Sequence, residues 1–307
     1  MVDHQLLKIY TVILNWNNFT DTEKCVDSLL AIKDSRIKPL IVDNHSSDNS
    51  ATLLKAKYNN IPILVSDQNK GYADGMNLGI KYALNNSADY IIISNNDIIY
   101  QNNFLSPLLE LIQKDNSIGI VSPKVLYTYD KQTIYCAGAD FNFLRASGVA
   151  AYQGKNSSDF GNDIREVSMA EGSCFLAKKD VFEKAGLFSE DFFMYFEDLE
   201  FSDRVRKQFK IFYTPFSIIY HKGGGGTNWS NHSPLYYYYY TRNRYLYFKK
   251  FRFSVKIYIL LYSLLVSLVK LITLGVNSLS QKNDGKNRAR ISSLIKGNLE
   301  GIKVFFN

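Results

Sequence analysis

The carboxylate with the clearest chemical context follows an apolar, strand-like segment, Tyr90–Ser94. That segment leads directly into Asn95, Asn96 and Asp97, so Asp97 lies where a strand is expected to end. Hard divalent cations prefer oxygen ligands and keep several waters or substrate phosphates, so one or two protein carboxylates are enough to hold them. We therefore predict that Asp97 binds a divalent cation. The alternative is that the Asn-Asn-Asp sequence only forms a turn.

A second group of carboxylates follows the aromatic run Phe192–Phe196. Glu197 and Asp198 come directly after this run, and Glu200 follows two residues later. Carboxylates beside such an apolar stretch are expected to have perturbed proton affinities, because burial disfavours their charged form. The pattern therefore indicates acid–base chemistry. The alternative is a solvated helix start, where acidic residues favour the positive end of the helix.

A histidine, His221, stands after the strand-like segment Ser217–Tyr220 and before the glycine run Gly223–Gly226. In this position it could bind a metal ion beside a mobile glycine loop. The alternative is a purely structural histidine, since a single histidine is more often part of the fold than a ligand.

Polar residues also follow two further predicted strands. Asp43 begins the segment DNHSSD, where a strand stops and a helix is expected to begin. Its carboxylate can accept hydrogen bonds from a nucleotide base or a ribose hydroxyl; alternatively, Asp43 and Ser47 cap the helix. The polar cluster Asn15–Asn18 follows the first strand, and we expect Asn15 to contact the nucleotide.

The segment NKGYADGMNLG, Asn69–Gly79, places small residues at the entry to a helix. Backbone can approach a ligand closely there, and a helix N-terminus favours phosphate. We predict that Asn69 and Gly75 belong to the nucleotide site. The alternative is a tight turn, because an isolated glycine pattern is weak evidence of binding.

The elements that must position these residues alternate between strands and helices over the first 120 residues. A capping box of Thr20 and Glu23 predicts one helix start, and further helical patterns follow Ser47, Gly71 and Asn102. This alternation predicts a doubly wound, mostly parallel α/β sheet, in which ligands bind beyond the carboxyl ends of the strands. The predicted strands are Ile9–Asn15, Pro39–Asp43, Pro62–Ser66, Tyr90–Ser94 and Ile118–Ser122.

We divide the chain into a catalytic domain, residues 1–240, and a helical extension, residues 241–307. The catalytic domain has a nucleotide-binding half at about 1–122 and an acceptor-binding half at about 123–240. Within the second half, Tyr127–Arg165 is predicted to be a loop-rich insertion that shapes an acceptor cleft. In the extension, Gln281–Arg290 is predicted to be a polar linker before an amphipathic helix, Ile291–Phe306.

The net charge of +7 is concentrated in the extension. From Arg242 onward the sequence contains 13 Lys and Arg residues but only two acidic residues, Asp284 and Glu300. Such asymmetry predicts contact with an anionic surface, and nothing in the main body suggests nucleic-acid binding. Three widely spaced cysteines favour a reducing compartment, and we expect no signal peptide, because Asp3 and His4 interrupt the N-terminus.

Within Val255–Leu279, polar residues recur at helical spacing and form a narrow stripe on an otherwise apolar helix. A helix that crosses a membrane rarely keeps a lysine such as Lys270 in its interior. We therefore predict a helix that lies on the cytoplasmic face of a membrane, peripheral and attracted by anionic lipid. The alternatives are a helix packed on the catalytic domain or in a homodimer interface. The stripe consists of Lys256, Ser263, Ser267, Lys270 and Asn277.

Taken together and in order, the motifs resemble glycosyltransferase family 2, and within it the bacterial rhamnosyltransferase-like branch. The matching strings are VILNWNN, VDNHSSD, NKGYADGMNLG, SNNDI, EGSCFLAKKDVFEKAGLFSEDFFMYFEDLEFSDRVRKQFK and HKGGGG, which together span about Val12–Gly226. The resemblance implies a GT-A fold and an inverting transferase that uses a nucleotide-diphosphate sugar with Mg²⁺ or Mn²⁺. We expect the acceptor to be a glycan, and an acceptor linked to a polyprenyl diphosphate would suit the predicted membrane location.

The resemblance also implies roles for individual residues. Asp43 would bind the base, Asn96 would face the ribose, and Asp97 would hold the metal on the diphosphate. His221 would be a further contact to the metal or the phosphate. Asp198 would be the catalytic base, with Glu197 beside it in the substrate site. The chain departs from the commoner acidic metal motif, because Asn95 and Asn96 stand where many relatives have Asp. Rhamnose, from dTDP-rhamnose, is the donor sugar that the resemblance favours, in bacterial surface polysaccharide synthesis.

Two other functions are compatible with a nucleotide-binding α/β sheet. A sugar-nucleotide nucleotidyltransferase usually has a glycine-rich, basic phosphate loop after its first strand, but here that loop reads NWNNFTD, with neither glycine nor a basic residue. A non-catalytic sugar-nucleotide-binding scaffold is the second alternative. The joint presence of Asp43, Asp97, Asp198 and His221 favours an enzyme.

Overall fold

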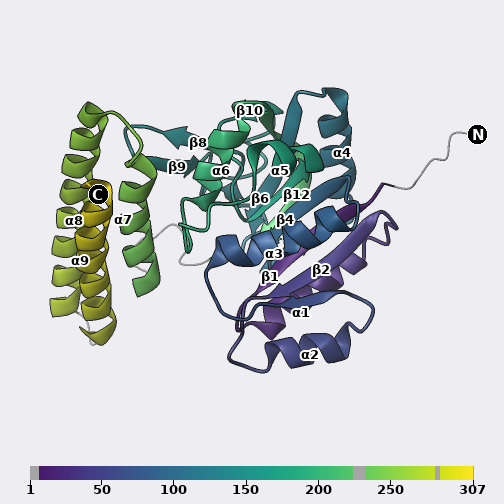
Figure 1. Cartoon of the computed structure of the whole chain (residues 1–307), viewed down its shortest axis with the longest axis horizontal. Coiled ribbons are helices and arrows are strands. Elements are labelled where there is room, and N and C mark those ends of the chain that lie inside the picture. The colour runs from purple at the N-terminus through teal and green to yellow at the C-terminus, as the bar shows by residue number, and fades with distance from the viewer. Residues whose placement is uncertain (1–6, 224–231, 281–283, 307) are drawn as a thin grey trace, which may run out of the picture. The chain divides into compact units, whose positions relative to one another are not determined.

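Short β-branched runs form the strands of one central sheet in the computed structural model of the chain (Figure 1). The structure describes residues 7–223, 232–280 and 284–306. The sheet order is β10-β12-β6-β11-β4-β1-β2-β3, with β5 paired to β12 and β7 paired to β6. These strands are β1 Ile9–Asn15, β2 Ile37–Asp43, β3 Ile63–Val65, β4 Tyr90–Asn95, β5 Ile98–Tyr100, β6 Ile118–Tyr127, β7 Ile134–Cys136, β10 Arg165–Val167, β11 Cys174–Lys178 and β12 Lys210–His221.

The sheet is mostly parallel, as the strand–helix alternation predicts. Parallel pairing joins β1 to β2, β1 to β4, β2 to β3 and β6 to β12. Strand β11 runs antiparallel to both β4 and β6, and β10 runs antiparallel to β12. Because β11 reverses direction between β4 and β6, those two strands point the same way, and the carboxyl ends of β1, β2, β4, β6 and β12 share one edge.

Helix α3, Tyr72–Asn85, covers one face of this sheet because its packing side is made of small and aliphatic residues. Met76 and Ile80 are fully buried against apolar side chains of β1, β2 and β4. A Cβ atom at Gly79 would lie 2.3 Å from Val12, so only glycine allows the helix to approach the strand this closely. The other helices of this part are α1 Phe19–Leu30, α2 Ser50–Lys57, α4 Leu105–Lys114, α5 Lys179–Ala185 and α6 Glu197–Val205.

The predicted capping box of Thr20 and Glu23 is wrong in detail. Helix α1 begins at Phe19, and its N-cap is Asn18, whose side chain accepts a hydrogen bond from the Asp21 backbone at 3.2 Å. Both residue types can cap a helix, and the turn that follows β1 brings Asn18 rather than Thr20 to the capping position.

The chain divides into two compact units. The sheet unit contains residues up to 223, except 142–147 and 194–196, which belong with residues 224–307 in a helical unit. The predicted boundary at residue 240 falls inside α7, Pro234–Phe248, which packs against the last helix. A hairpin of β8, Ala139–Asn142, and β9, Ser147–Ala150, carries residues 142–147 at its turn.

Three helices, α7, α8 and α9, run side by side in the helical unit (Figure 1). Helix α8 spans Phe253–Ser280, and α9 spans Asp284–Phe306. The expected polar linker, Gln281–Arg290, is therefore wrong over most of its length, because α9 begins at Asp284. Tertiary contacts outweigh polar composition here: Asn287 is buried, and the Arg290 guanidinium donates a hydrogen bond to the His232 carbonyl at 2.9 Å.

Candidate active site

The carboxyl ends of β1, β2 and β4 bring the predicted polar residues to one edge of the sheet. Asn15 pairs in register with Asp43, and Leu14 pairs with Asn95. The partners in these two pairs are 28 and 81 positions apart in sequence, but the parallel pairing makes them neighbours. The edge is therefore the place where the candidate nucleotide and metal residues meet.

Asp43 is fully buried and is held by hydrogen bonds from β1 and from its own turn. Asn15 Nδ2 donates to Asp43 Oδ2 at 2.7 Å, and the Ser46 backbone donates to Oδ1 at 2.9 Å. Asp43 does not cap α2, which begins at Ser50 after Asn49. Asp43 and Ser47 therefore do not cap this helix. The Asp43 carboxylate instead accepts hydrogen bonds from Ser46 in the loop that follows β2.

Asn96 joins the same network through a residue that the sequence analysis did not identify, Thr22 of α1. Asn96 Nδ2 donates to Thr22 Oγ1 at 2.8 Å, and Thr22 Oγ1 lies 2.7 Å from Asn15 Oδ1. A chain of polar contacts therefore runs from Asp43 through Asn15 and Thr22 to Asn96. Thr22 lies within the predicted helix near its start, but only the packing of α1 against β1 and β5 reveals its contacts.

Asn69 and Gly75 lie at and beyond the entry to α3. Asn69 Oδ1 accepts hydrogen bonds from the Gly71 backbone at 2.9 Å and from Asn44 Nδ2 at 3.2 Å. Gly71 has a φ of 104°, and a Cβ there would lie 2.1 Å from the Phe193 carbonyl oxygen. Gly75 lies against Leu14, where a Cβ would come within 2.6 Å. Packing explains this glycine, and its contact with a nucleotide stays a prediction.

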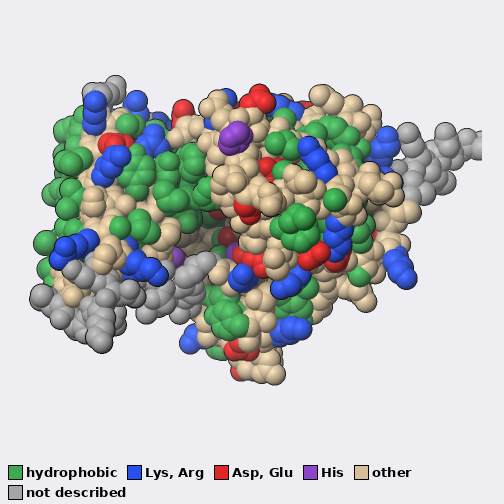
Figure 2. All heavy atoms as spheres, turned by 90° about the horizontal axis from the view of Figure 1, so that it is seen from below, with side chains coloured by type: hydrophobic (Ala, Val, Ile, Leu, Met, Phe, Trp, Pro, Cys, Tyr) green, Lys and Arg blue, Asp and Glu red, His purple; other side chains and the backbone are tan. Residues whose placement is uncertain are grey.

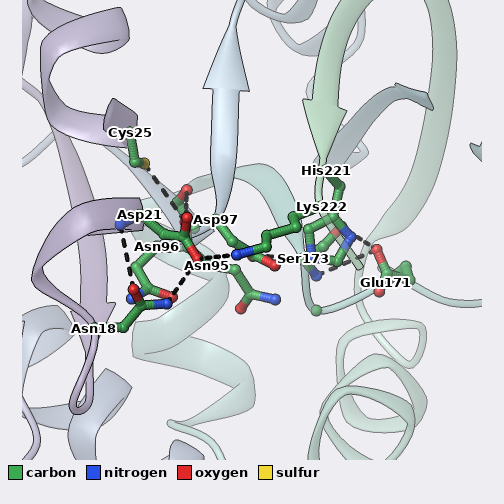
Figure 3. A network of polar contacts seen from close by, with 12 residues as sticks. Asn18, Asp21, Cys25, Asn95, Asn96, Asp97, Glu171, Ser173, His221 and Lys222 are labelled. Atoms are coloured by element: carbon green, nitrogen blue, oxygen red, sulfur yellow. Dashed lines mark hydrogen bonds and ion pairs between the residues drawn. The ribbon is translucent and has the colours of Figure 1, made fainter. Parts of the chain in front are cut away.

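Asp97 and His221 form a direct pair, although 124 residues separate them in sequence (Figure 3). His221 Nε2 lies 3.0 Å from Asp97 Oδ1, and the imidazole is only 5% exposed. Burial alone would lower the pKa of His221, but the hydrogen bond and the charge of Asp97 outweigh it, so the pKa is raised. The tyrosine ring of Tyr135 stands edge-on to the imidazole, with centroids 4.5 Å apart.

These two side chains fit a divalent cation that takes its remaining ligands from water or substrate. The described residues contain no group of three or more His, Cys, Asp or Glu side chains that could hold a metal without such help. His221 Nδ1 is buried and has no hydrogen-bond partner in the described part of the chain. Gly224–Gly226, the rest of the predicted glycine loop, lie outside the described residues.

Asp198 lies in the first turn of α6 and is anchored by two backbone amides. Gly172 N donates to Asp198 Oδ2 at 3.1 Å, and Leu199 N donates to Oδ1 at 2.8 Å. Burial, reinforced by the negative charge of Glu171, raises the pKa of Asp198 to about 7. A carboxylate with this pKa is suited to take up a proton near neutral pH.

Glu171 is the functional candidate that the sequence analysis missed. It precedes β11 on the same edge of the sheet and bonds to Ser173 (Figure 3). Its charge acts on Asp198 and on His221, so it belongs to the electrostatics of both sites. The signal was available, since Glu171 begins the EGSC string, but only the antiparallel insertion of β11 brings it beside α6.

The three carboxylates of the EDLE sequence have different surroundings. Glu200 is bound by Arg204, one helical turn further along α6, with a closest N–O distance of 2.9 Å. Glu197 is 7% exposed, its Oε2 has no partner among the described residues, and burial together with the charge of Asp198 raises its pKa well above the usual range. The predicted perturbation of proton affinity therefore holds for Glu197 and Asp198.

The backbone before these carboxylates is in an unusual conformation. Tyr195 and Phe196 have φ values of 67° and 74°, which non-glycine residues rarely adopt. Asn243 of α7 holds this turn within the helical unit, because its Nδ2 donates to the carbonyls of Met194 and Tyr195 at 2.9 and 3.0 Å. Strained backbone of this kind is concentrated at functional sites.

The sequence of the chain is similar to those of known glycosyltransferases. A family model described as Glycosyl transferase family 2 matches residues 10–186. The chain is 27% identical over 199 residues to the low-salt glycan biosynthesis hexosyltransferase Agl10 of Haloferax volcanii, covering 64% of this chain and 61% of that protein. It is 23% identical over 221 residues to the N-acetylglucosaminyl-diphospho-decaprenol L-rhamnosyltransferase of Mycobacterium tuberculosis, covering 65% of this chain and 71% of that protein.

A similar fold is found in the mannosyltransferase PcManGT from Pyrobaculum calidifontis, solved with GDP-Man and Mn²⁺. The TM-score is 0.56 at 11% sequence identity, and the match covers 96% of this chain and 87% of that chain. At this identity the likeness shows the fold alone, and it supports the GT-A architecture with a C-terminal helical region. The match to Agl10 spans less than two thirds of that protein's length.

Proposed function

The chain belongs to glycosyl transferase family 2, and from this premise we propose that it transfers a sugar from a nucleotide-diphosphate donor to a glycan or lipid-linked acceptor. The observation that carries the proposal is the convergence of three groups on one sheet edge. These are the buried Asp43–Asn15 pair, the Asp97–His221 pair and the anchored Asp198. Each group matches one requirement of the reaction: recognition of the nucleotide, neutralisation of the diphosphate and removal of a proton.

The donor site is proposed to lie along the polar chain at the ends of β1, β2 and β4. Asp43 and Asn15 would bind the base, and Asn96 would face the ribose. Asn69, Gly75 and Glu197 are proposed to complete the substrate contacts. The four side chains Asn15, Asp43, Asn69 and Asn96 are already fixed by hydrogen bonds between protein atoms, so a nucleotide would meet a preorganised surface.

Asp97 and His221 are proposed to hold Mg²⁺ or Mn²⁺. The cation would take the place of the proton that joins the two side chains, and when bound it neutralises charge on the departing diphosphate. The Mn²⁺ in the similar mannosyltransferase structure supports a divalent cation in this fold. Because this pair supplies one carboxylate and one imidazole, water or the diphosphate would supply the rest of the coordination.

Asp198 is proposed to be the catalytic base. The acceptor hydroxyl oxygen forms a bond to the anomeric carbon while its proton passes to the Asp198 carboxylate. The bond between the anomeric carbon and the diphosphate oxygen breaks, and the diphosphate leaves with the electron pair. A single displacement of this kind inverts the configuration at the anomeric carbon. Glu200 is a poor alternative base because Arg204 already binds it.

L-Rhamnose from dTDP-rhamnose is the donor that we propose, and the acceptor is proposed to be linked to a polyprenyl diphosphate. The name of the mycobacterial relative states L-rhamnosyl transfer and a diphospho-decaprenol acceptor for that protein, at 23% identity. The hexosyltransferase relative supports the coarser assignment to glycan synthesis. Pocket shape decides between sugars, so the identity of the donor is a question for direct measurement.

The helical unit is proposed to rest on an anionic membrane surface at the cytoplasmic face. Helix α8 is long and apolar enough to cross a membrane, judged by length and composition alone. Its outward face is a row of half or more exposed aliphatic side chains, and hydrophobic side chains gather over this unit (Figure 2). Those more than half exposed are Leu261, Leu265, Leu268, Val269, Ile272 and Val276.

An in-plane position suits this helix better than a crossing one. Helices α7 and α9 pack along α8, so a crossing α8 would carry their charged residues into the hydrocarbon. The exposed Lys249, Lys250 and Arg252 precede α8 and would meet anionic headgroups, each adding about 1 kcal/mol. Truncation after Phe248 would strip α7 of its partner helices, so a point substitution is the better test.

The proposed activity is tested by incubating the full-length protein with a panel of sugar nucleotides and Mn²⁺ and measuring released nucleoside diphosphate. We expect release with one or a few donors and loss of release in excess EDTA. A nucleotidyltransferase would release inorganic diphosphate instead, and a scaffold would release neither product. Turnover that persists unchanged in EDTA would exclude the proposed role of Asp97 and His221.

The membrane contact is tested by flotation with vesicles of phosphatidylglycerol. Leu265→Glu places a charge on the exposed face of α8, and Phe216→Glu is the matched control on β12, since the two side chains are 62% and 65% exposed. We expect the first change to abolish flotation and the second to leave it intact. If the wild-type protein stays with the soluble fraction at low salt and elutes as a dimer that Leu265→Glu dissociates, the face is a homodimer interface instead.

A further inference from the structure

Two cations of the helical unit lie against one tyrosine ring. Arg244 belongs to α7 and Lys270 to α8. The Arg244 Cζ atom is 5.3 Å from the centroid of the Tyr240 ring, and the Lys270 Nζ atom is 5.8 Å from the same centroid. Two positive charges, one from each helix, therefore share the ring of Tyr240.

Arg244 is buried with unused hydrogen-bonding capacity. Arg244 is only 4% exposed, and its Nε atom has no hydrogen-bond partner in the described part of the chain. The guanidinium contacts the rings of Tyr240 and Tyr262, which offer π faces but no in-plane acceptor. A buried charge without a counter-ion is costly, and folded proteins usually pair it.

Lys270 lies against the same group of tyrosine rings and is partly exposed. Its ammonium group lies 5.6 Å from the centroids of both Tyr236 and Tyr237. Burial, followed by the charge of Arg244, lowers the pKa of Lys270 to about 8. The polar stripe of α8 that includes Lys270 faces its partner helices: Ser263 and Ser267 are buried, and Ser267 bonds to Asn298.

The helical unit does not neutralise these charges with its own carboxylates. The sequence from residue 224 onward contains only two, Asp284 and Glu300. Glu300 accepts a hydrogen bond from Tyr238 and lies 3.8 Å from Lys296. No described carboxylate pairs with Arg244 or Lys270, so the counter-ion must come from outside the described chain.

We propose that Arg244 and Lys270 form a binding site for the phosphate or diphosphate group of an amphiphilic lipid. Arg and Lys are the side chains that bind phosphate most strongly, and tyrosine hydroxyls can add hydrogen bonds. The apolar tail of such a lipid would lie against the exposed aliphatic side chains that neighbour Lys270 on α8. Val269 and Ile272 are 54% and 60% exposed. The inference rests on the proposed function, because a lipid-linked acceptor or a bilayer phospholipid would each supply this chemistry.

The test measures binding of farnesyl diphosphate to the full-length protein in a zwitterionic detergent by calorimetry, with farnesol and inorganic diphosphate as comparison ligands. Wild-type protein is expected to bind farnesyl diphosphate much more tightly than either. Lys270→Met and Arg244→Gln should each weaken it at least about tenfold, the scale of one charged hydrogen bond. Lys270→Arg should retain binding, because it keeps the positive charge. If Arg244→Gln does not fold, the contrast between Lys270→Met and Lys270→Arg decides whether the site binds farnesyl diphosphate.

Lys256→Met is the matched control, because Lys256 is also on α8 and also contacts a ring, but its Nζ lies 3.3 Å from the Phe305 carbonyl oxygen. It should bind as wild type. Equal binding of farnesol and farnesyl diphosphate, or unchanged binding in Lys270→Met with a lowered melting temperature, would overturn the site in favour of a structural cation–π clamp.

The source of the phosphate is decided by competition. If phosphatidylglycerol vesicles displace farnesyl diphosphate and phosphatidylcholine vesicles do not, the site takes bilayer headgroups; if neither does, it takes the lipid-linked acceptor. Both outcomes support the phosphate site. Release of nucleoside diphosphate from donor without acceptor should be the same in Lys256→Met and wild type. A failure of that release in both proteins would count against the proposed transferase activity and not against this site.

Discussion

Replacement of Asp198 by Asn tests the step on which the proposed mechanism depends. The amide keeps the size of the carboxylate and can still accept the Gly172 amide hydrogen bond, but it cannot take up a proton. General-base catalysis typically contributes 10²–10⁴-fold. Asp198→Asn should therefore lower kcat by at least about 100-fold, or roughly 2.7 kcal/mol of activation free energy. Donor affinity should stay the same, because the base contacts the acceptor.

The raised pKa of Asp198 adds a pH dependence with a definite sign. With a pKa of about 7, the carboxylate is mostly protonated below neutral pH, so wild-type kcat should rise with pH through about 7. Stability should change in the opposite sense. The folded state keeps a proton that the unfolded chain has already released, so between about pH 4 and pH 7 folding becomes less favourable as pH rises. An amide cannot ionise, so Asp198→Asn removes this loss of stability at high pH. The variant should therefore melt at a higher temperature than wild type at pH 8.

The assay pairs turnover with acceptor across pH 5–9 and donor binding by calorimetry with metal present. Glu200→Gln is the control, since Glu200 lies on the same helix but pairs with Arg204; it should keep activity within a few-fold. Turnover of Asp198→Asn within tenfold of wild type would refute the assignment and move the base to Glu197. An equal loss of donor affinity would instead place Asp198 in the metal site.

Three further changes test the rest of the site. Asp97→Ala should abolish turnover and weaken donor binding, measured by calorimetry, because the diphosphate charge is left poorly neutralised; donor affinity like that of wild type would exclude the metal role. Thr22→Val should raise the donor Kd, because it removes the oxygen that accepts the Asn96 hydrogen bond, and an unchanged Kd would separate Asn96 from the donor. Asn243→Ala should destabilise the protein by about 1–3 kcal/mol, seen as a lower melting temperature, whereas the exposed Asn103→Ala should not; equal melting would show that the turn holds without Asn243.

The sequence alone was sufficient to predict the sheet edge and the residues that lie on it. The predicted strand Ile9–Asn15 matches β1 at both ends, and the strand that leads to Asp43 ends where predicted. The reason is local: β-branched runs stop where polar residues begin, and parallel strands gather their carboxyl ends at one edge. The family assignment came from the order of the motifs, and the family model confirms it.

The partners of those residues were decided only by the tertiary structure. Nothing local indicates that Asp97 meets His221 or that Glu171 raises the pKa of Asp198, because these contacts depend on how β11 and β12 join the sheet. The same holds for α8. Its spacing shows a polar stripe and an apolar remainder, but a helical pattern does not say which side meets protein. Packing with α7 and α9 turns the stripe inward and leaves the aliphatic side exposed, since Ser267 and Lys256 find hydrogen-bond partners there in Asn298 and the Phe305 carbonyl of α9.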